Sequence, residues 1–309
     1  MGEAKRKLVK RKESQSSCSA VQTMAGRVQV RWEAESAATP MGQLAYFIEF
    51  LTLSGLWSRW IESCPLAYTS PNAPGKGEVL GTWMLSILSG HRRYAHVTGI
   101  RCDGVNPALL GMGKVISEDA LRSALKHIAQ SGGSAWLEQH LSESVAPLLD
   151  APWILDIDTT IKPLYGHQQG ALPGYNPRKP GRPSHAYHTY LMAGLRQVLG
   201  VDVAAGNEHT AGHAQPGLLK ILDALPAAHT PRLVRGDNAF GNDALLTELE
   251  ARTQPYLSKL KLTKNVKRYI GALFRQSGWV DAGQGWEGQD GELTLTGWHG
   301  KRRVVVLRR

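Results

Sequence analysis

The sequence has few features that would cross-link the chain, anchor it in a membrane or export it. Its three cysteines, Cys18, Cys64 and Cys102, are odd in number and form no CxxC pair, which argues against a disulfide framework or a zinc ribbon and favours a reducing cytoplasm. No uncharged apolar window reaches the roughly 18 residues of a membrane span, and the best candidate, residues 44–57, contains Glu49. The basic N-terminus lacks the apolar segment of a secretory signal. We therefore expect a cytoplasmic protein with no membrane partner.

Several common catalytic motifs are also missing. The sequence contains no GxSxG, no P-loop and no GxGxxG with the correct flanks, so these routes to hydrolase, nucleotide or dinucleotide chemistry have no support. His209 and His213 have the i, i+4 spacing of a helical zinc site, but Gly212 and Pro216 should interrupt a regular helix there. We do not expect zinc.

Positive charge is in excess. Lysine and arginine total 36 against 26 acidic residues, which gives a net charge of +10 and a pI near 9.6. A polyanion such as nucleic acid is the expected partner, although many basic proteins have no such role. Residues 5–12 form a cationic run followed by a Ser-rich stretch, and we treat residues 1–38 as a basic N-terminal arm, either solvated or in contact with the DNA backbone.

Residues 39–150 have helical patterns. Apolar spacing predicts helices over residues 41–64, 78–93 and 116–133, the last begun by Ser117 as N-cap and ended by Gly132 and Gly133. Arg122 and Lys126 lie four residues apart on the exposed face of that helix. We predict that this region is a helical DNA-binding domain and that these two cations contact the DNA. The alternative is a plain helical bundle.

The pattern changes after residue 150. Apolar segments at 152–158, 184–197 and 198–207 predict three strands, and they precede the order helix, strand, helix, strand. That order is the α/β order of a ribonuclease-H-like core, assigned to residues 151–275. The Gly-rich tail, residues 276–309, predicts β-hairpins that form a β-rich insertion.

Two carboxylates lie on one face of the first predicted strand. Asp156 and Asp158 are two residues apart, so both point the same way. Burying one carboxylate without a partner is costly, and hard oxygen ligands are what Mg²⁺ selects. Asp237 ends another predicted strand, and strand C-termini are where ligands bind in open α/β sheets. We predict that Asp158 and Asp237 share a divalent metal ion for phosphodiester chemistry. The alternative is that each aspartate caps a turn, with Thr159 and Thr160 or with Asn238.

A cationic loop follows the two aspartates. Prolines stiffen residues 162–185, and glycines allow the backbone to approach a bulky ligand. We predict that its cations hold the phosphates being cut, and they are Lys162, Arg178, Lys179 and Arg182. Tyr165 and Tyr175 are candidates for stacking on a base, although ordinary packing is an alternative.

The segments "DIDTT", "YGHQQGALPGYNPRKPGRPSH", "GN" at 206–207 and "RGDNAF" together resemble a bacterial insertion-sequence transposase of the DDE class, closest to the insertion sequence 1380 family. The resemblance covers roughly residues 40–309. It implies a ribonuclease-H-like core, a helical DNA-binding region and cut-and-paste transfer with two Mg²⁺ (or Mn²⁺) ions. It further implies that a homodimer acts on terminal repeats and target DNA. Its first and second acids fall on Asp158 and Asp237, with Asp156 as an alternative for the first.

The resemblance also implies a third acid, a glutamate on a helix after the last core strand and the insertion. The predicted helix over residues 263–276 contains no acid, and the next carboxylates, Asp281, Glu287, Asp290 and Glu292, lie in the Gly-rich tail. We therefore expect a C-terminally truncated form that is inactive. A DNA-binding remnant without catalysis and a ribonuclease-H-like nuclease are the alternatives.

Overall fold

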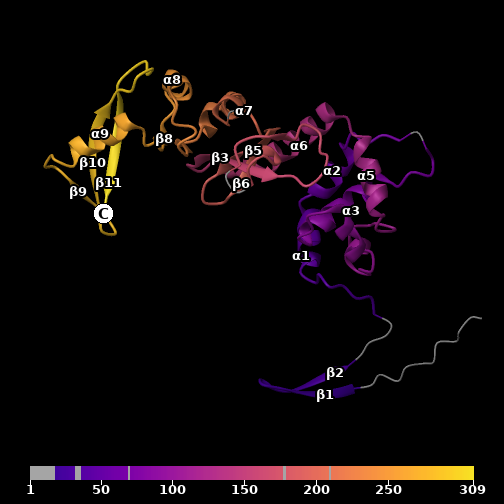
Figure 1. The fold of residues 1–309 in the computed structure, drawn as a ribbon. Coiled ribbons are helices and arrows are strands. Elements are labelled where there is room, and N and C mark those ends of the chain that lie inside the picture. Colours follow the sequence, from indigo (N-terminus) through magenta and orange to yellow (C-terminus); the bar gives the residue numbers. More distant parts are fainter. Residues whose placement is uncertain (1–17, 32–35, 69, 177–178, 209) are drawn as a thin grey trace, which may run out of the picture. The chain divides into compact units, whose positions relative to one another are not determined.

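The computed structural model describes residues 18–31, 36–68, 70–176, 179–208 and 210–309 (Figure 1). Contacts divide the chain into two compact units, Met1–Trp136 and Leu137–Arg309. Each unit has its own hydrophobic core. Across the residues that the structure describes, no helix combines the length and apolar character needed to cross a bilayer.

The N-terminal unit begins with a hairpin inside the segment treated as a basic arm. Its strands are β1 (Cys18–Thr23) and β2 (Gly26–Arg31), which pair antiparallel. Helical elements follow, namely α1 (Leu44–Leu53), α2 (Leu56–Glu62), α3 (Lys76–Leu88), η1 (Tyr94–Ile100), α4 (Asn106–Leu109), α5 (Glu118–Lys126) and α6 (Gln130–Val145). The predicted helical character of this region is confirmed, whereas the hairpin has no counterpart in the sequence predictions.

Two of the predicted helix boundaries are wrong and one is correct. The single helix predicted over 41–64 is wrong, because Gly55 adopts a left-handed φ of 66° and separates α1 from α2. Ser117 caps α5 as predicted, its hydroxyl accepting from the Ala120 N–H at 3.2 Å. Gly132 and Gly133 do not end that helix, because α5 stops at Lys126 and both glycines lie within α6.

Tryptophans stack on one another at the core of the N-terminal unit. The Trp60 ring stacks on Trp136 at 5.0 Å and on Trp83 at 6.0 Å between ring centroids. The indole N–H of Trp136 donates to the Trp60 carbonyl at 3.1 Å. Stacked indoles bury much apolar area while keeping their N–H groups paired, so this cluster fixes how α2, α3 and α6 pack.

The C-terminal unit is mixed α/β and follows the predicted element order. Its elements are η2 (Ala146–Leu148), β3 (Ile154–Pro163), β4 (Leu172–Pro173), β5 (Pro183–Met192), β6 (Gln197–Ala205), α7 (Thr210–Ala224), η3 (Ala227–His229), β7 (Leu233–Gly236), α8 (Asp243–Ala251), β8 (Tyr256–Ser258) and α9 (Lys264–Leu273). The main sheet has the order β4-β5-β3-β7-β8, with β6 also paired to β5. Strands β3, β7 and β8 run parallel, while β5 is antiparallel to β3 and β6.

One face of this sheet is packed against helices. Leu155 and Ile157 of β3 are buried with Leu218 of α7 and Leu249 of α8 in one core. Because side chains alternate along a strand, the aspartates between and after them point to the opposite face. Helix α7 lies close to β5 and β6, where a Cβ at Gly217 would come within 1.9 Å of an Asp202 carboxylate oxygen. Only glycine allows that approach.

A separate three-stranded sheet confirms the β-rich tail. Its strands are β9 (Val280–Gly283), β10 (Trp286–Leu293) and β11 (Arg302–Arg308), in the order β11-β10-β9. Helix α9 packs on β10, since a Cβ at Gly291 would lie 1.9 Å from the Tyr269 hydroxyl. Arg302, only 6% exposed, connects β11 to α8 through Asp243 and Glu250.

Candidate active site

The structure brings Asp158 and Asp237 together. In the parallel pairing of β3 with β7, the last partners are Ile157 and Gly236. The two aspartates are the next residues on each chain, and neighbouring strands lie about 4.8 Å apart. Both aspartates are exposed. The two aspartates therefore occupy adjacent positions at the carboxyl end of the parallel pair.

The turn after β7 fixes the position of Asp237. One carboxylate oxygen accepts from the Ala239 N–H at 2.9 Å, and the Asp237 carbonyl accepts from the Phe240 N–H at 3.2 Å. The predicted turn-capping contact thus exists for Asp237, and the second carboxylate oxygen remains available. Gly236 permits the tight turn, because a Cβ there would lie 2.8 Å from the Phe240 Cβ.

Asp158 has a different local setting from the predicted one. The prediction that β3 ends at this residue is wrong: β3 continues to Pro163, and Asp158 pairs with Thr189 of β5. The turn alternative therefore fails for Asp158, and the Thr159 hydroxyl is hydrogen-bonded to His188 Nδ1 at 2.8 Å instead. Among the described residues, no side chain pairs with the Asp158 carboxylate.

Asp156 is already occupied. Both its carboxylate oxygens accept from the Arg235 guanidinium, at 2.7 and 2.6 Å, across the β3–β7 register. This bidentate contact raises the pKa of Arg235 above its ordinary value. A carboxylate held by a guanidinium is a poor candidate for the first acid. The geometry therefore favours Asp158 over Asp156.

Close backbone contacts hold the cationic loop against the sheet. A Cβ at Gly174 would lie 1.8 Å from the Gly206 carbonyl oxygen. The two backbone segments therefore could not come this close if residue 174 carried a side chain. The Leu164 N–H donates to the Pro183 carbonyl at 2.9 Å and closes the base of the loop. These contacts explain why the sequence needs glycine here and again at "GN".

Tyrosine rings hold three of the predicted DNA-binding cations. The Lys162 ammonium lies 5.2 Å from the Tyr187 ring centroid, while Lys179 and Arg182 lie 5.1 and 4.4 Å from that of Tyr165. The hydrogen bond from Lys179 is the main cause that lowers the pKa of the Tyr165 phenol. Arg178, the fourth predicted cation, lies outside the described residues.

Lys162 faces the same way as the acids. Lys162 and Asp158 are four residues apart on β3, so both point to the sheet face that α7 and α8 leave open. The sequence contains no aspartate or glutamate between Asp158 and Asp202. The cations of the loop therefore have no acidic partner from their own segment.

The two cations predicted on α5 belong to the N-terminal unit and differ from each other. Arg122 is paired with Asp119 at 3.1 Å, and its guanidinium carbon lies 5.2 Å from the Tyr94 ring centroid. Lys126 is exposed and has no ion pair within the described part of the chain. Only Lys126 is therefore fully available to a phosphate without rearrangement.

Within the described part of the chain, no third acid joins the pair. Helix α9 contains no carboxylate, as the sequence predicts. Three of the four carboxylates of the three-stranded sheet are paired with cations: Glu287 with Arg308, Asp290 with Arg303 and Glu292 with Lys301, at 2.7, 2.8 and 2.9 Å. The fourth, Asp281, accepts from the Gly283 N–H at 2.8 Å. Over the described residues, no group of three or more His, Cys, Asp or Glu side chains is arranged to hold a metal ion.

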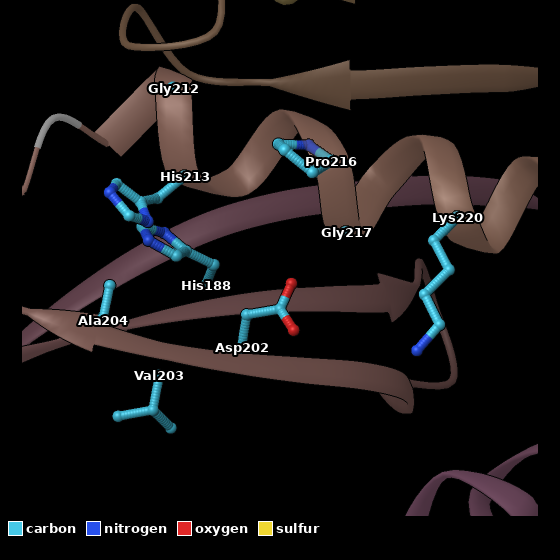
Figure 2. A pocket seen from close by; sticks show the side chains of 9 residues that line it. All are labelled: His188, Asp202, Val203, Ala204, Gly212, His213, Pro216, Gly217 and Lys220. Atoms are coloured by element: carbon cyan, nitrogen blue, oxygen red, sulfur yellow. The ribbon is translucent and has the colours of Figure 1, made fainter. Parts of the chain in front are cut away.

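A cavity of about 460 Å³ lies on the helix-covered side of the sheet, beside α7 (Figure 2). His188 and Asp202 point toward the helix, whereas Val203 points away. His188 is fully buried, burial lowers its pKa, and its Nε2 has no partner among the described residues. The Asp202 carboxylate accepts from the Tyr190 hydroxyl at 2.8 Å.

Sequence reasoning did not predict this cavity. The expectation that Gly212 and Pro216 would interrupt a helix is wrong, since both lie within α7. His213 is hydrogen-bonded to Glu208 at 2.9 Å, and His209 lies outside the described residues. The aspartate pair and this cavity occupy different sheet faces, so they are separate features.

A family model described as "Transposase DDE domain" matches residues 150–301. These residues are similar to a transposase DDE domain. The matched segment contains the aspartate pair, the cationic loop and most of the C-terminal unit, and it ends just before β11. No curated protein matches the chain.

Solved transposase structures are similar to the chain at low identity. A piggyBac transposase synaptic complex with hairpin DNA is 13% identical, with a TM-score of 0.35, and the match covers 90% of this chain and 54% of that one. A Mos1 transposase paired-end complex with the left transposon end is 12% identical over 69% and 75% of the chains, with a TM-score of 0.24. A Mos1 mariner paired-end complex with Mn is 11% identical over 68% of each chain, with a TM-score of 0.24. The chain spans about half the length of the piggyBac transposase that it matches.

Proposed function

We propose that this protein is a DNA transposase with a ribonuclease-H-like core, and that Asp158 and Asp237 are its first and second acids. The observation that carries the proposal is the β3–β7 register, which leaves these two residues adjacent beyond the pair Ile157–Gly236. Asp158 and Asp237 are far apart along the chain, so only the pairing of β3 with β7 makes them adjacent. The match of the DDE domain to the same segment gives the pair its chemical context.

The donor set fits a divalent cation. Two exposed carboxylates side by side repel one another unless a cation lies between them, and carboxylate oxygens are what Mg²⁺ or Mn²⁺ takes. A bound divalent ion would supply Lewis-acid stabilisation of the phosphodiester oxygens. Asp158 and Asp237 would hold it, while Asp156 would hold Arg235 and keep the strand register fixed.

The cationic loop would bind the DNA backbone beside the acids. Lys162, Lys179 and Arg182 are displayed on tyrosine rings, have no acidic partner in their segment and lie on the strand and loop that follow Asp158. Cations held in place lose less conformational freedom when they engage phosphates. Arg122 and Lys126 of the N-terminal unit would add further contacts.

The substrate would be DNA bearing the terminal repeats of an insertion sequence of the 1380 family, together with target DNA. Cutting both element ends in one assembly requires two catalytic sites, so we further propose a homodimer on DNA. The steps in which the chain takes part are binding the ends, presenting the scissile phosphate to the acid pair and neutralising its charge.

DNA binding without cleavage is the second candidate function. The specific observation in its favour is that Glu287, Asp290 and Glu292 are each paired with a cation, and that α9 has no acid. Preorganised groups at a reacting centre are typically worth about 10²–10³ in rate each. With two acids available, we expect this chain alone to bind DNA and to cut it poorly or not at all.

A cleavage assay with plasmid DNA carrying the element ends, in Mg²⁺ or Mn²⁺, tests both candidates. Matched variants are Asp158→Ala, Asp237→Ala and the control Asp281→Ala, an exposed acid of β9. Binding without cleavage in all four proteins supports the second candidate. Cleavage lost in the first two variants but kept in the control supports the active transposase, and Glu287→Gln and Glu292→Gln then test for a third acid. Absence of DNA binding in the parent protein contradicts both.

A further inference from the structure

A second cavity, of about 230 Å³, lies within the N-terminal unit. It is bounded by the end of α3, by the start of η1 and by Leu121 of α5. Its inner surface is apolar and includes Val97 and Leu121, both buried. Neither the charge pattern nor the DDE domain accounts for this site.

Aromatic and aliphatic side chains at the cavity are held in place yet partly open to solvent. Trp83 is half-buried, and its ring stacks on Trp60 with 6.0 Å between the ring centroids. At the mouth, Ile87 is 56% exposed and Tyr94 is 39% exposed. Large apolar side chains exposed together around a hollow are typical of a binding site rather than of ordinary surface.

One polar group lies inside this apolar surface. The Ser86 hydroxyl and His91 Nδ1 are hydrogen-bonded at 3.1 Å. Burial, and next the nearby His96, lower the pKa of His91, so its ring is neutral at neutral pH. A neutral imidazole whose Nδ1 is engaged by a hydroxyl can donate or accept at Nε2. This is the kind of group that recognises the polar edge of a heterocyclic ring.

Cations surround the mouth. Arg92 and Arg93 are exposed, and neither has a carboxylate partner among the residues that the structure describes. Arg122 behaves differently: it is paired with Asp119 and lies against the Tyr94 ring, so it positions that ring. Asp103, the acid nearest in sequence to Arg93, is buried and accepts from Asn106 and Thr39. The free charge at the mouth is therefore positive.

We propose that this cavity binds an unpaired base of DNA, with the base against Trp83 and Tyr94 and with Arg92 and Arg93 on the adjoining phosphates. The proposal rests on the DNA-binding function proposed above and gives the N-terminal unit a defined part in it. The cavity has room for a ring system and not for a duplex, whose bases are stacked and paired inside. Aromatic stacking binds any base, whereas the guanidiniums bind only a charged backbone. Single-stranded or frayed DNA is therefore the expected ligand.

The test uses the full chain and two fluorescent DNAs of equal length, one single-stranded with a central 2-aminopurine and one fully duplex. The variants are Tyr94→Ala and Arg93→Ala. Their controls are Tyr46→Ala, an exposed tyrosine on α1, and Arg59→Ala, an exposed arginine on α2. Circular dichroism establishes that each variant is folded. Tyr94→Phe keeps the aromatic ring and serves as a second variant if Tyr94→Ala does not fold.

Loss of one stacking contact should weaken single-strand binding by about 5- to 100-fold for Tyr94→Ala, and the Phe variant should bind like the parent. The change in 2-aminopurine fluorescence on binding should shrink with it, while duplex affinity changes less than the single-strand affinity. Equal affinities for Tyr94→Ala and Tyr46→Ala overturn the cavity proposal and leave the proposed function intact. Equal losses on single strand and duplex also overturn it, because a backbone-binding surface would behave that way. If the parent chain binds neither the single-stranded nor the duplex DNA, the result contradicts the proposed function itself.

Discussion

Two cation-rich regions of the C-terminal unit use their charges in opposite ways. Residues 159–201 carry five lysines and arginines with no acidic residue among them. The three-stranded sheet carries cations on β11 and the segment just before it, and Lys301, Arg302, Arg303 and Arg308 each have a carboxylate partner. Both regions are rich in lysine and arginine, yet among the described residues Lys162, Lys179 and Arg182 of the first region have no carboxylate partner.

The difference lies in the partners of the cations and not in the amount of positive charge. In the loop, tyrosine rings position the cations without neutralising them. In the sheet, carboxylates neutralise the cations and fix β10 against β11 and β11 against α8. We expect changes in the loop to affect DNA binding and changes in the sheet to affect stability.

The largest expected effect is on stability, from Arg302→Ala. Arg302 is 6% exposed and binds Glu250, Asp243 and Thr247. Its loss should reduce the free energy of unfolding by roughly 2–3 kcal/mol, less than the 3–5 kcal/mol of a fully buried pair because Glu250 is partly exposed. Urea denaturation measures the change, with hydrogen exchange in α8 and β11 to locate it. Arg303→Ala, its exposed neighbour, is the control, and equal losses in the two variants would contradict the assignment of Arg302 as structural.

The next effect is on DNA affinity, from the triple variant Lys162→Gln, Lys179→Gln, Arg182→Gln. If each cation neutralises one phosphate, the slope of log affinity against log salt should become shallower by about 3. Fluorescence anisotropy across a salt titration measures it. The matched control removes Lys301, Arg303 and Arg308 in the same way. A control with the same shallower slope would remove the distinction between the two regions.

A smaller effect concerns stability at low pH. Hydrogen bonds from Arg302, and next from His299, lower the pKa of Asp243 to about 2. An acid with a depressed folded-state pKa stabilises the fold above its unfolded pKa of about 3.9, and that stabilisation is lost as pH falls toward the folded value. Unfolding free energy should therefore decline between about pH 4 and 2, and less steeply in Asp243→Asn. Parallel pH profiles for parent and variant would exclude this contribution.

The smallest effect should come from removing the carboxylate partner of one sheet cation, so that this cation is unpaired like those of the loop. Glu292→Gln leaves Lys301, which is exposed, without its partner. Exposed ion pairs contribute little to stability, so the midpoint of unfolding should hardly move. DNA affinity at low salt should rise slightly, because one more cation becomes free. A clear loss of stability would show that this surface pair is structural after all.

Much of the fold could be predicted from local patterns. Strand and helix order after residue 150 follows from apolar periodicity, and the caps at Ser117 and Thr263 are local hydrogen bonds. The errors are also local in origin. Gly55 breaks a helix because its backbone turns left-handed, whereas Gly133 does not, and the residue type alone does not distinguish these outcomes.

The site was predicted in composition but not in arrangement. Asp158 and Asp237 could be selected because each follows apolar strand residues. The engagement of Asp156 could not, because its partner Arg235 is 79 residues away and meets it only through the parallel register. The cavities of both units were also missed, since a cavity depends on which side chains are absent between elements that the sequence places far apart.

The sequence by itself determined the element order, the acid-free cationic loop and the presence of carboxylates at strand positions, because these depend on neighbours within a few residues. Only the tertiary structure decided which charges are free. Register between β3 and β7 leaves Asp158 beside Asp237 and commits Asp156 to Arg235. Packing of β11 on α8 commits Arg302 to Asp243 and Glu250. Strand register and helix packing are set by burial of apolar faces between distant segments, so the pairing of charges follows from the core and not from the local sequence.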